Sequence, residues 1–164
     1  MHAGGKYEGL LQPCVARVLA HGARYASHID GGDKLKYYGF PYWLEIDGWS
    51  RKIISLCLVE SNNDPVITAR IWLQNVRRHG SVPVLVMSDA GSENVLIHAL
   101  QSFLRRNHTD SMAGIAYMIV TSPSNQRAEA MNRIIRVRVL DLFLDDFADL
   151  EAGGYLPDCW VISY

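Results

Sequence analysis

The chain has 164 residues, of which 49% are hydrophobic and 20% are charged, and its formal net charge is −1. This composition suits one globular domain with a full core, and it excludes a strongly basic nucleic-acid binder. No apolar run approaches the ~20 residues of a membrane span, so we expect no membrane segment.

Charge is unevenly distributed along the chain. Residues 1–140 hold all sixteen Lys and Arg together with eleven acidic residues, whereas residues 141–164 hold six acidic residues and no Lys or Arg. The mildly basic part could meet a polyanion, but solvated faces of both signs explain the pattern equally well.

The three cysteines, Cys14, Cys57 and Cys159, are widely spaced and odd in number. This spacing argues against a disulfide framework and against a zinc site. It fits a reducing compartment, and we expect an intracellular, nuclear location.

Three strands are predicted first, after a poorly defined N-terminal segment over residues 1–26. The second and third strands form a hairpin, because Asp47-Gly48 is a strong tight-turn signal. The predicted strands cover residues 27–30, ending in Gly31-Gly32, then 40–46 and 52–59.

Helices and strands then alternate. A helix enters at Pro65 and ends at Gly80, and a second begins at Ser92, which is expected to cap it. A final helix begins near Asn125 and runs to about Phe147. The strands between these helices cover residues 83–87 and 115–120.

The order β-β-β-α-β-α-β-α predicts an α/β fold. We expect one mixed five-stranded sheet, with three antiparallel strands, two parallel strands and helices on both faces. This core covers residues 27–150, and residues 151–164 form an acidic C-terminal tail. The inward positions are expected to share one core: Ile54, Leu56, Val84, Val86, Leu100, Ile134 and Ile135.

Three acidic residues occupy related positions in this fold. Asp30 ends the first strand, Asp89 ends the fourth, and Glu129 lies in the first turns of the last helix. If the two strands are parallel neighbours, all three carboxylates meet at one edge of the sheet. Such a cluster would hold Mg²⁺ or Mn²⁺, and two ions would suit in-line displacement at phosphorus.

Each acid also has a structural alternative. Asp30 and Asp89 precede Gly-containing segments and could serve only as turn or capping residues. Glu129 could be a solvated side chain paired with Arg133 one turn later. Separately these alternatives are favoured, but three acids at matching topological positions are less expected by chance.

The segments around these acids carry a family resemblance. Ser27–Asp30, Met87–Asn94 and Gln126–Asn132 resemble the three acidic motifs of the retroviral-integrase-like DDE catalytic cores, with 39 residues between Asp89 and Glu129. A eukaryotic, transposon-derived subgroup of integrase cores, found in transposons and host genomes, has segments that look like Asp30–Leu35, Ile46–Arg51 and Ser124–Arg127. The resemblance implies a ribonuclease H-like fold, DNA integration, catalysis by Asp30, Asp89 and Glu129, and divalent metal bound by the same acids.

Two functions remain open. The chain is either a DDE-type polynucleotidyl transferase or endonuclease, or a domesticated or decayed core that binds DNA or protein without catalysis. Ser27 stands where the family usually has Trp, and no helix-turn-helix or zinc-finger pattern is visible. DNA is the expected partner, with a possible homo-oligomer, and the candidate phosphate contacts are Lys34, Lys36, Arg127 and Arg133.

Overall fold

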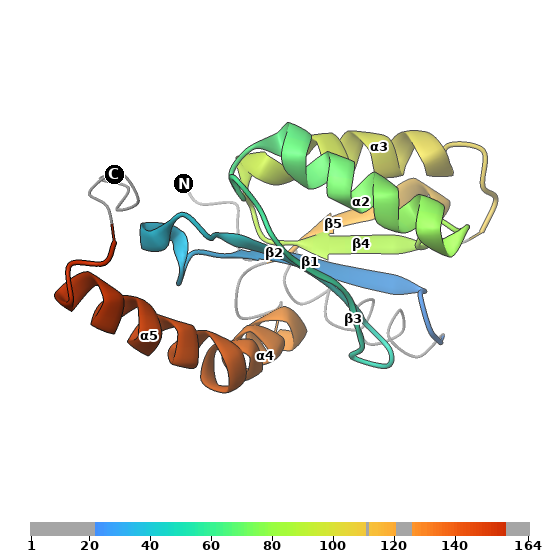
Figure 1. Cartoon of the computed structure of the whole chain (residues 1–164). Coiled ribbons are helices and arrows are strands. Elements are labelled where there is room, and N and C mark those ends of the chain that lie inside the picture. The colour runs from blue at the N-terminus through green and yellow to red at the C-terminus, as the bar shows by residue number, and fades with distance from the viewer. Residues whose placement is uncertain (1–21, 111, 121–125, 157–164) are drawn as a thin grey trace, which may run out of the picture.

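The structure is a computed structural model that describes residues 22–110, 112–120 and 126–156. Its centre is one five-stranded sheet with the strand order β3-β2-β1-β4-β5 (Figure 1). The predicted fold class, a mixed sheet between helices, is confirmed. The strands are β1 (Ala26–Gly32), β2 (Tyr42–Asp47), β3 (Ile53–Leu58), β4 (Leu85–Ser88) and β5 (Tyr117–Ile119).

Strand pairing follows the predicted mixture. β1 pairs with β2 and β2 pairs with β3 in antiparallel fashion, whereas β4 lies parallel to both β1 and β5. The parallel pairs arise because α2 and α3 return the chain across one face of the sheet (Figure 1). The carboxyl ends of β1, β4 and β5 therefore lie at the same edge.

The first strand includes both glycines after Asp30 and ends at Gly32. Gly31 pairs with Trp43 and Gly32 with Tyr42, so β1 continues past Asp30. Gly32 is required there by packing, because a Cβ atom would lie 1.9 Å from Cζ of the Tyr42 ring. Gly32 therefore reflects a close approach of Tyr42 to the strand.

Helix α2 (Pro65–His79) has the boundaries that its sequence predicts. Asp64 caps it, because its Oδ1 accepts a hydrogen bond of 2.8 Å from the Val66 N–H. Pro65 occupies the first helical position, where a missing N–H costs nothing. Gly80 ends the helix with a φ of 66°, a left-handed conformation that glycine adopts freely.

Helix α3 (Val95–Arg105) begins later than predicted. Ser92 does not cap it with its side chain, and a 3-10 turn over Ser92–Asn94 leads into it. The last helix is also more complex than its sequence suggests: α4 (Gln126–Ile135) passes through a π-helical segment (Arg136–Leu140) into α5 (Asp141–Ala152). α4 and α5 lie on the opposite face of the sheet from α2 and α3 (Figure 1).

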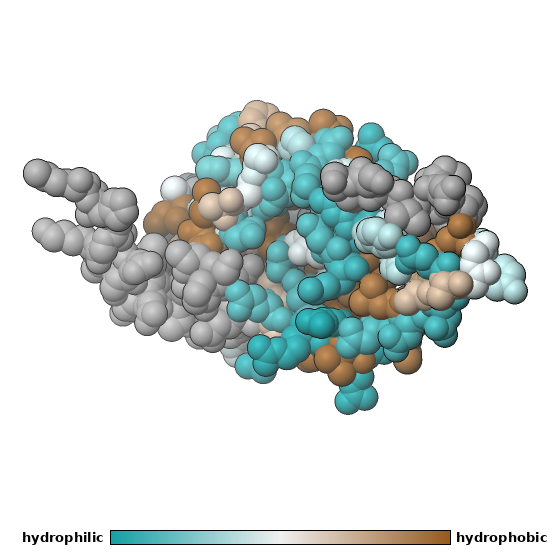
Figure 2. All heavy atoms as spheres, turned by 90° about the vertical axis from the view of Figure 1, so that its left-hand side faces the viewer, coloured by the Kyte–Doolittle hydropathy of each residue, from teal (hydrophilic) through white to brown (hydrophobic). Residues whose placement is uncertain are grey.

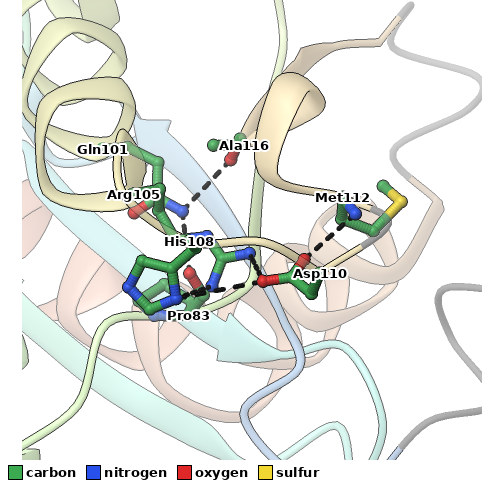
Figure 3. Close-up of polar contacts among 7 residues, drawn as sticks. All are labelled: Pro83, Gln101, Arg105, His108, Asp110, Met112 and Ala116. Atoms are coloured by element: carbon green, nitrogen blue, oxygen red, sulfur yellow. Dashed lines mark hydrogen bonds and ion pairs between the residues drawn. The ribbon is translucent and has the colours of Figure 1, made fainter.

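Polar side chains attach α3 to the segments that flank β4 and β5 (Figure 3). The buried Gln101 amide donates to the Pro83 carbonyl at 2.8 Å and to the Ala116 carbonyl at 3.1 Å. The buried Arg105 guanidinium forms an ion pair with Asp110 at 2.5 Å. The Gln101 amide thereby links the segments before β4 and β5: it gives the Pro83 carbonyl a donor and adds a second donor to the Ala116 carbonyl, which also accepts from the Val86 N–H.

The expectation of a single core is wrong, because the sheet has two covered faces and three clusters of buried residues. Val86 belongs to the cluster under α2 and α3, whereas Ile135 belongs to a cluster between α4 and strand β2. Val84 packs against a third cluster, built on Leu85 and Met87, on the face opposite Val86.

Two predicted core residues are exposed. Leu56 is 42% exposed because β3 is an edge strand of the sheet, and Ile134 is 54% exposed. Ile134 is exposed because α4 turns a different face to the sheet, formed by Ala128, Met131 and Ile135. Ile54 is half-buried, and Leu100 packs against the cluster under α2 and α3. None of the helices in the described ranges is long and apolar enough to cross a membrane.

Candidate functional site

The three predicted acids come from three different elements. Asp30 lies on β1 opposite Leu44, on the face of the sheet that α4 covers. Asp89 follows the last residue of the parallel neighbour β4, and Glu129 is an exposed residue in the first turn of α4. The parallel pairing of β1 and β4 directs Asp30 and Asp89 to the same edge, as predicted from the strand order.

Asp30 experiences the other acids directly. Burial raises the pKa of Asp30 from 3.8 to about 6, together with the negative charges of Asp89 and, to a smaller extent, Glu129 and Glu93. A hydrogen bond from the Gly31 N–H opposes this rise. Carboxylates that are not neutralised by a cation repel one another in this way. The structure thus brings Asp30 within electrostatic range of both predicted partners.

The side chains do not form a closed metal cage. Among residues 22–110, 112–120 and 126–156, no three His, Cys, Asp or Glu side chains are grouped closely enough to hold a metal ion. The donor set nevertheless fits a hard divalent cation, because it consists of carboxylate oxygens in a region of unneutralised negative charge. Within the described chain, the Asp89 and Glu129 carboxylates have no hydrogen-bond or ion-pair partner that would compete.

Asn132 is a site residue that the sequence reasoning missed. Its Nδ2 donates to Oδ2 of Asp30 at 2.6 Å, and its Oδ1 accepts from the Tyr42 hydroxyl at 3.0 Å. This chain of hydrogen bonds joins α4 to β1 and β2 and fixes one oxygen of Asp30. A signal was present, because Asn132 follows Ala128 by four residues and precedes Ile135 by three, on the buried face of α4.

Glu93 also acts on the site electrostatically. Its carboxylate folds back over Gly91, where a Cβ atom would lie 1.8 Å from Oε1. Oε1 accepts a hydrogen bond of 2.8 Å from Asn94. The negative charge of Glu93 contributes to the raised pKa of Asp30, so Glu93 is a fourth acid beside the predicted three.

A cleft of about 230 Å³ adjoins Asp89 at the carboxyl ends of β4 and β5. The Tyr117 and Ser88 hydroxyls form a hydrogen bond of 2.6 Å at its base, and the His98 ring stacks on Tyr117. Burial raises the pKa of Tyr117 to about 12, so its hydroxyl stays protonated at neutral pH. The cleft is lined by Ser88, Asp89, Gly91, Ser92, Asn94, Val95, His98, Tyr117 and Ile119.

The four candidate DNA-contacting cations lie in different surroundings. Lys34 and Arg133 are exposed, whereas Lys36 forms an ion pair with Asp33 at 3.7 Å. The side chain of Arg127 lies outside the described residues. In the part of the chain that the structure describes, Arg133 forms no ion pair with Glu129, which is contrary to the structural alternative for Glu129.

Comparison with known proteins agrees with this architecture. The family model for the integrase core domain matches residues 23–159. The chain is similar to the solved HTLV-2 integrase catalytic core domain in complex with magnesium (trimeric form), with a TM-score of 0.52 and 20% sequence identity. The match covers 84% of this chain and 80% of that chain, and it shows a shared fold. The comparison with curated proteins found no match. Because the family model spans most of the sequence, the chain belongs to the integrase core domain family.

Proposed function

We propose that this protein is a metal-dependent polynucleotidyl transferase that cleaves DNA strands and transfers them to new positions. One observation carries the proposal. The negative charges of Asp89, at the end of β4, and of Glu129, on α4, both act on the half-buried Asp30 carboxylate of β1. A cluster of like charges is costly unless it serves a cation. Asp30, Asp89 and Glu129 would hold Mg²⁺ or Mn²⁺, and magnesium is present in the similar HTLV-2 structure.

The residues of the chain have distinct parts in this proposal. Two bound divalent ions would supply activation of the attacking oxygen and stabilisation of the leaving oxygen at phosphorus. Asn132 orients the Asp30 carboxylate by holding Oδ2 in place, which leaves its remaining lone pairs for a cation. Glu129 is exposed on the first turn of α4, so it can approach Asp30 with little rearrangement.

DNA would be held mainly through its phosphates. Lys34 follows Asp30 by four residues, and Arg133 follows Glu129 by four residues on α4; both side chains are exposed. Cations beside a carboxylate cluster offset its repulsion of the DNA backbone. Lys36 is less suited because Asp33 already neutralises part of its charge.

A homo-oligomer is also part of the proposal. Figure 2 shows hydrophobic groups among hydrophilic ones on the face that it draws. The segment from α4 to α5 exposes large apolar residues, which single-domain proteins usually cover by association when they are contiguous. These residues are Ile134, Val137, Val139, Leu142, Phe143 and Leu150. The similar HTLV-2 core was solved in a trimeric form.

The test compares the Asp89→Asn variant with the wild-type protein, both as the whole chain. The assay follows DNA nicking and strand joining with Mg²⁺ or Mn²⁺ at low salt. Asn retains the shape of Asp89 but removes the charge that would hold a cation, so activity should be lost while the fold stays intact. The exposed Asp145 on α5 provides a matched control, and Asp145→Asn should keep the activity. Low salt matters because phosphate contacts weaken steeply as salt rises.

A second function, DNA or protein binding without catalysis, is favoured by one observation. The three acids are not assembled into a metal-binding group within the described residues. Calorimetric titration with Mn²⁺ separates the two functions. If the wild type releases or absorbs heat on binding Mn²⁺ and Asp89→Asn does not, the transferase is supported. If the wild type binds DNA but shows neither Mn²⁺ binding nor cleavage, the non-catalytic core is supported.

A further inference from the structure

A second polar pocket lies at the other end of the sheet. It has a volume of about 460 Å³ and is formed by the segment before β1, the β2–β3 turn and the end of α2. The extended residues of β1 from Ala26 to Asp30 separate the pocket from the candidate active site, and at about 3.3 Å per residue they span about 13 Å. Its lining residues are Ala23, Arg24, Asp47, Ser50, Lys52, Ile53, Ile54, Arg78 and His79.

Arg24 is held in this pocket with hydrogen-bonding capacity to spare. Its backbone N–H donates to Asp47 at 2.6 Å, and its Nη2 donates to the Ser81 carbonyl at 3.0 Å. Its Nε and Nη1 are shielded from solvent and have no hydrogen-bond partner among the described residues. The backbone of Arg24 has a φ of 61°, a left-handed conformation that residues other than glycine rarely adopt. Buried donors of this kind call for an acceptor.

The nearby acids are engaged elsewhere. The Asp47 carboxylate accepts from the backbone N–H groups of Arg24 and Ser50 and from the Ser50 hydroxyl, so it closes the hairpin turn. Glu45 is buried, and its Oε2 accepts from Nδ2 of Asn75 at 2.8 Å. Glu45 lies in electrostatic range of Arg24, but it forms no hydrogen bond with the guanidinium.

Positive charge therefore exceeds negative charge at the pocket. Three cationic residues, Arg24, Lys52 and Arg78, line the pocket. Asp47 is the only acidic lining residue within the described chain. His79 reports the same field, because burial and then the charges of Arg24, Arg78 and Lys52 lower its pKa. The same three cations and His79 line one pocket.

We propose that this pocket binds a phosphate group, carried by a ligand of about the size of a mononucleotide. Arg24 carries a positive charge and two unpartnered N–H donors, which a rotation of the shielded guanidinium would present to phosphate oxygens, and Lys52 and Arg78 would complete the neutralisation. Ile53 and Ile54 would contact the apolar part of the ligand, and the pocket volume lies within the usual range for small-molecule sites. This site is separate from the proposed active site and does not depend on metal.

The experiment titrates the whole chain with inorganic phosphate and with deoxyadenosine monophosphate, followed by calorimetry at constant ionic strength set with NaCl. We expect saturable binding that Arg24→Gln weakens about 10-fold or more, because charge-assisted hydrogen bonds to the phosphate are lost. Lys52→Gln and Arg78→Gln should each weaken binding several-fold. Arg70→Gln, at an exposed position of α2 outside the pocket, is the matched control and should bind as the wild type does.

Further comparisons make the outcome decisive. Asp89→Asn should bind phosphate normally, so failure of the proposed catalytic function would not imitate failure of this site. A 5′-phosphorylated single strand that binds through Arg24, when its unphosphorylated form does not, identifies nucleic-acid ends as the source; binding of the mononucleotide alone identifies a free ligand. Absence of saturation at ~10 mM phosphate, or equal affinity in all three pocket variants, overturns the proposal. If Arg24→Gln fails to fold, Lys52→Gln and Arg78→Gln decide the result.

Discussion

Replacement of Asp30 by Asn should stabilise the metal-free protein at neutral pH. The Asp30 pKa rises from 3.8 to about 6 in the folded state because of burial and then the nearby carboxylates. The contribution of the neutral Asp30 carboxyl to the free energy of unfolding is fully present below pH 3.8. It is lost as the pH rises through about 6, where the folded protein must hold the charged form. Asn is permanently neutral, so it avoids this loss and can still accept a hydrogen bond from Asn132 or Gly31.

The magnitude follows from the same pKa values. Each pH unit between the folded and unfolded pKa is worth about 1.4 kcal/mol, so a rise from 3.8 to about 6 sets an upper limit of roughly 3 kcal/mol. The Asp30 side chain is only partly buried, and solvent screening reduces this value. We expect Asp30→Asn to raise the free energy of unfolding by about 1–2 kcal/mol at pH 7.5.

The assay is urea unfolding of both proteins with EDTA at a series of pH values. The difference in unfolding free energy should be largest above pH 6 and should disappear toward pH 3.8. Asp145→Asn, at an exposed position of α5, serves as the control and should show no comparable pH dependence. A constant difference across the pH range, or a destabilised Asp30→Asn at pH 7.5, would refute the idea that carboxylates crowd around Asp30.

Three further substitutions test the packing around the site and the sheet. Asn132→Ala should lower the unfolding free energy by about 1–3 kcal/mol in urea, because Asp30 and Tyr42 both lose their shared partner; an unchanged midpoint would show that the link is not stabilising. Gly32→Ala should cost about 1–3 kcal/mol by thermal unfolding, since the new methyl group would overlap the Tyr42 ring, and wild-type stability would contradict that contact. Gln101→Leu should cost about 1–3 kcal/mol in urea, because the Pro83 carbonyl loses its side-chain donor and the Ala116 carbonyl keeps only the Val86 N–H, and faster amide hydrogen exchange in β5 should accompany it.

The local signals in the sequence determined much of the fold. The boundaries of α2 follow from Asp64, Pro65 and Gly80, because capping and left-handed turns depend on residues adjacent in the chain. The alternation of strands and helices after the hairpin predicted a mixed sheet, since a crossover helix makes parallel neighbours. That topology predicted that Asp30 and Asp89 lie at one edge of the sheet.

Only the tertiary structure decided which side chains complete the site and which apolar residues are covered. Asn132 lies on the helical face that α4 turns to the sheet, and its role depends on Tyr42, ninety residues away in the sequence. Leu56 and Ile134 have the periodicity of core residues but are exposed, because β3 is the sheet edge and α4 is rotated. Periodicity identifies an apolar face but not its neighbour, and long-range packing between elements sets both the burial of that face and the partners of a polar side chain.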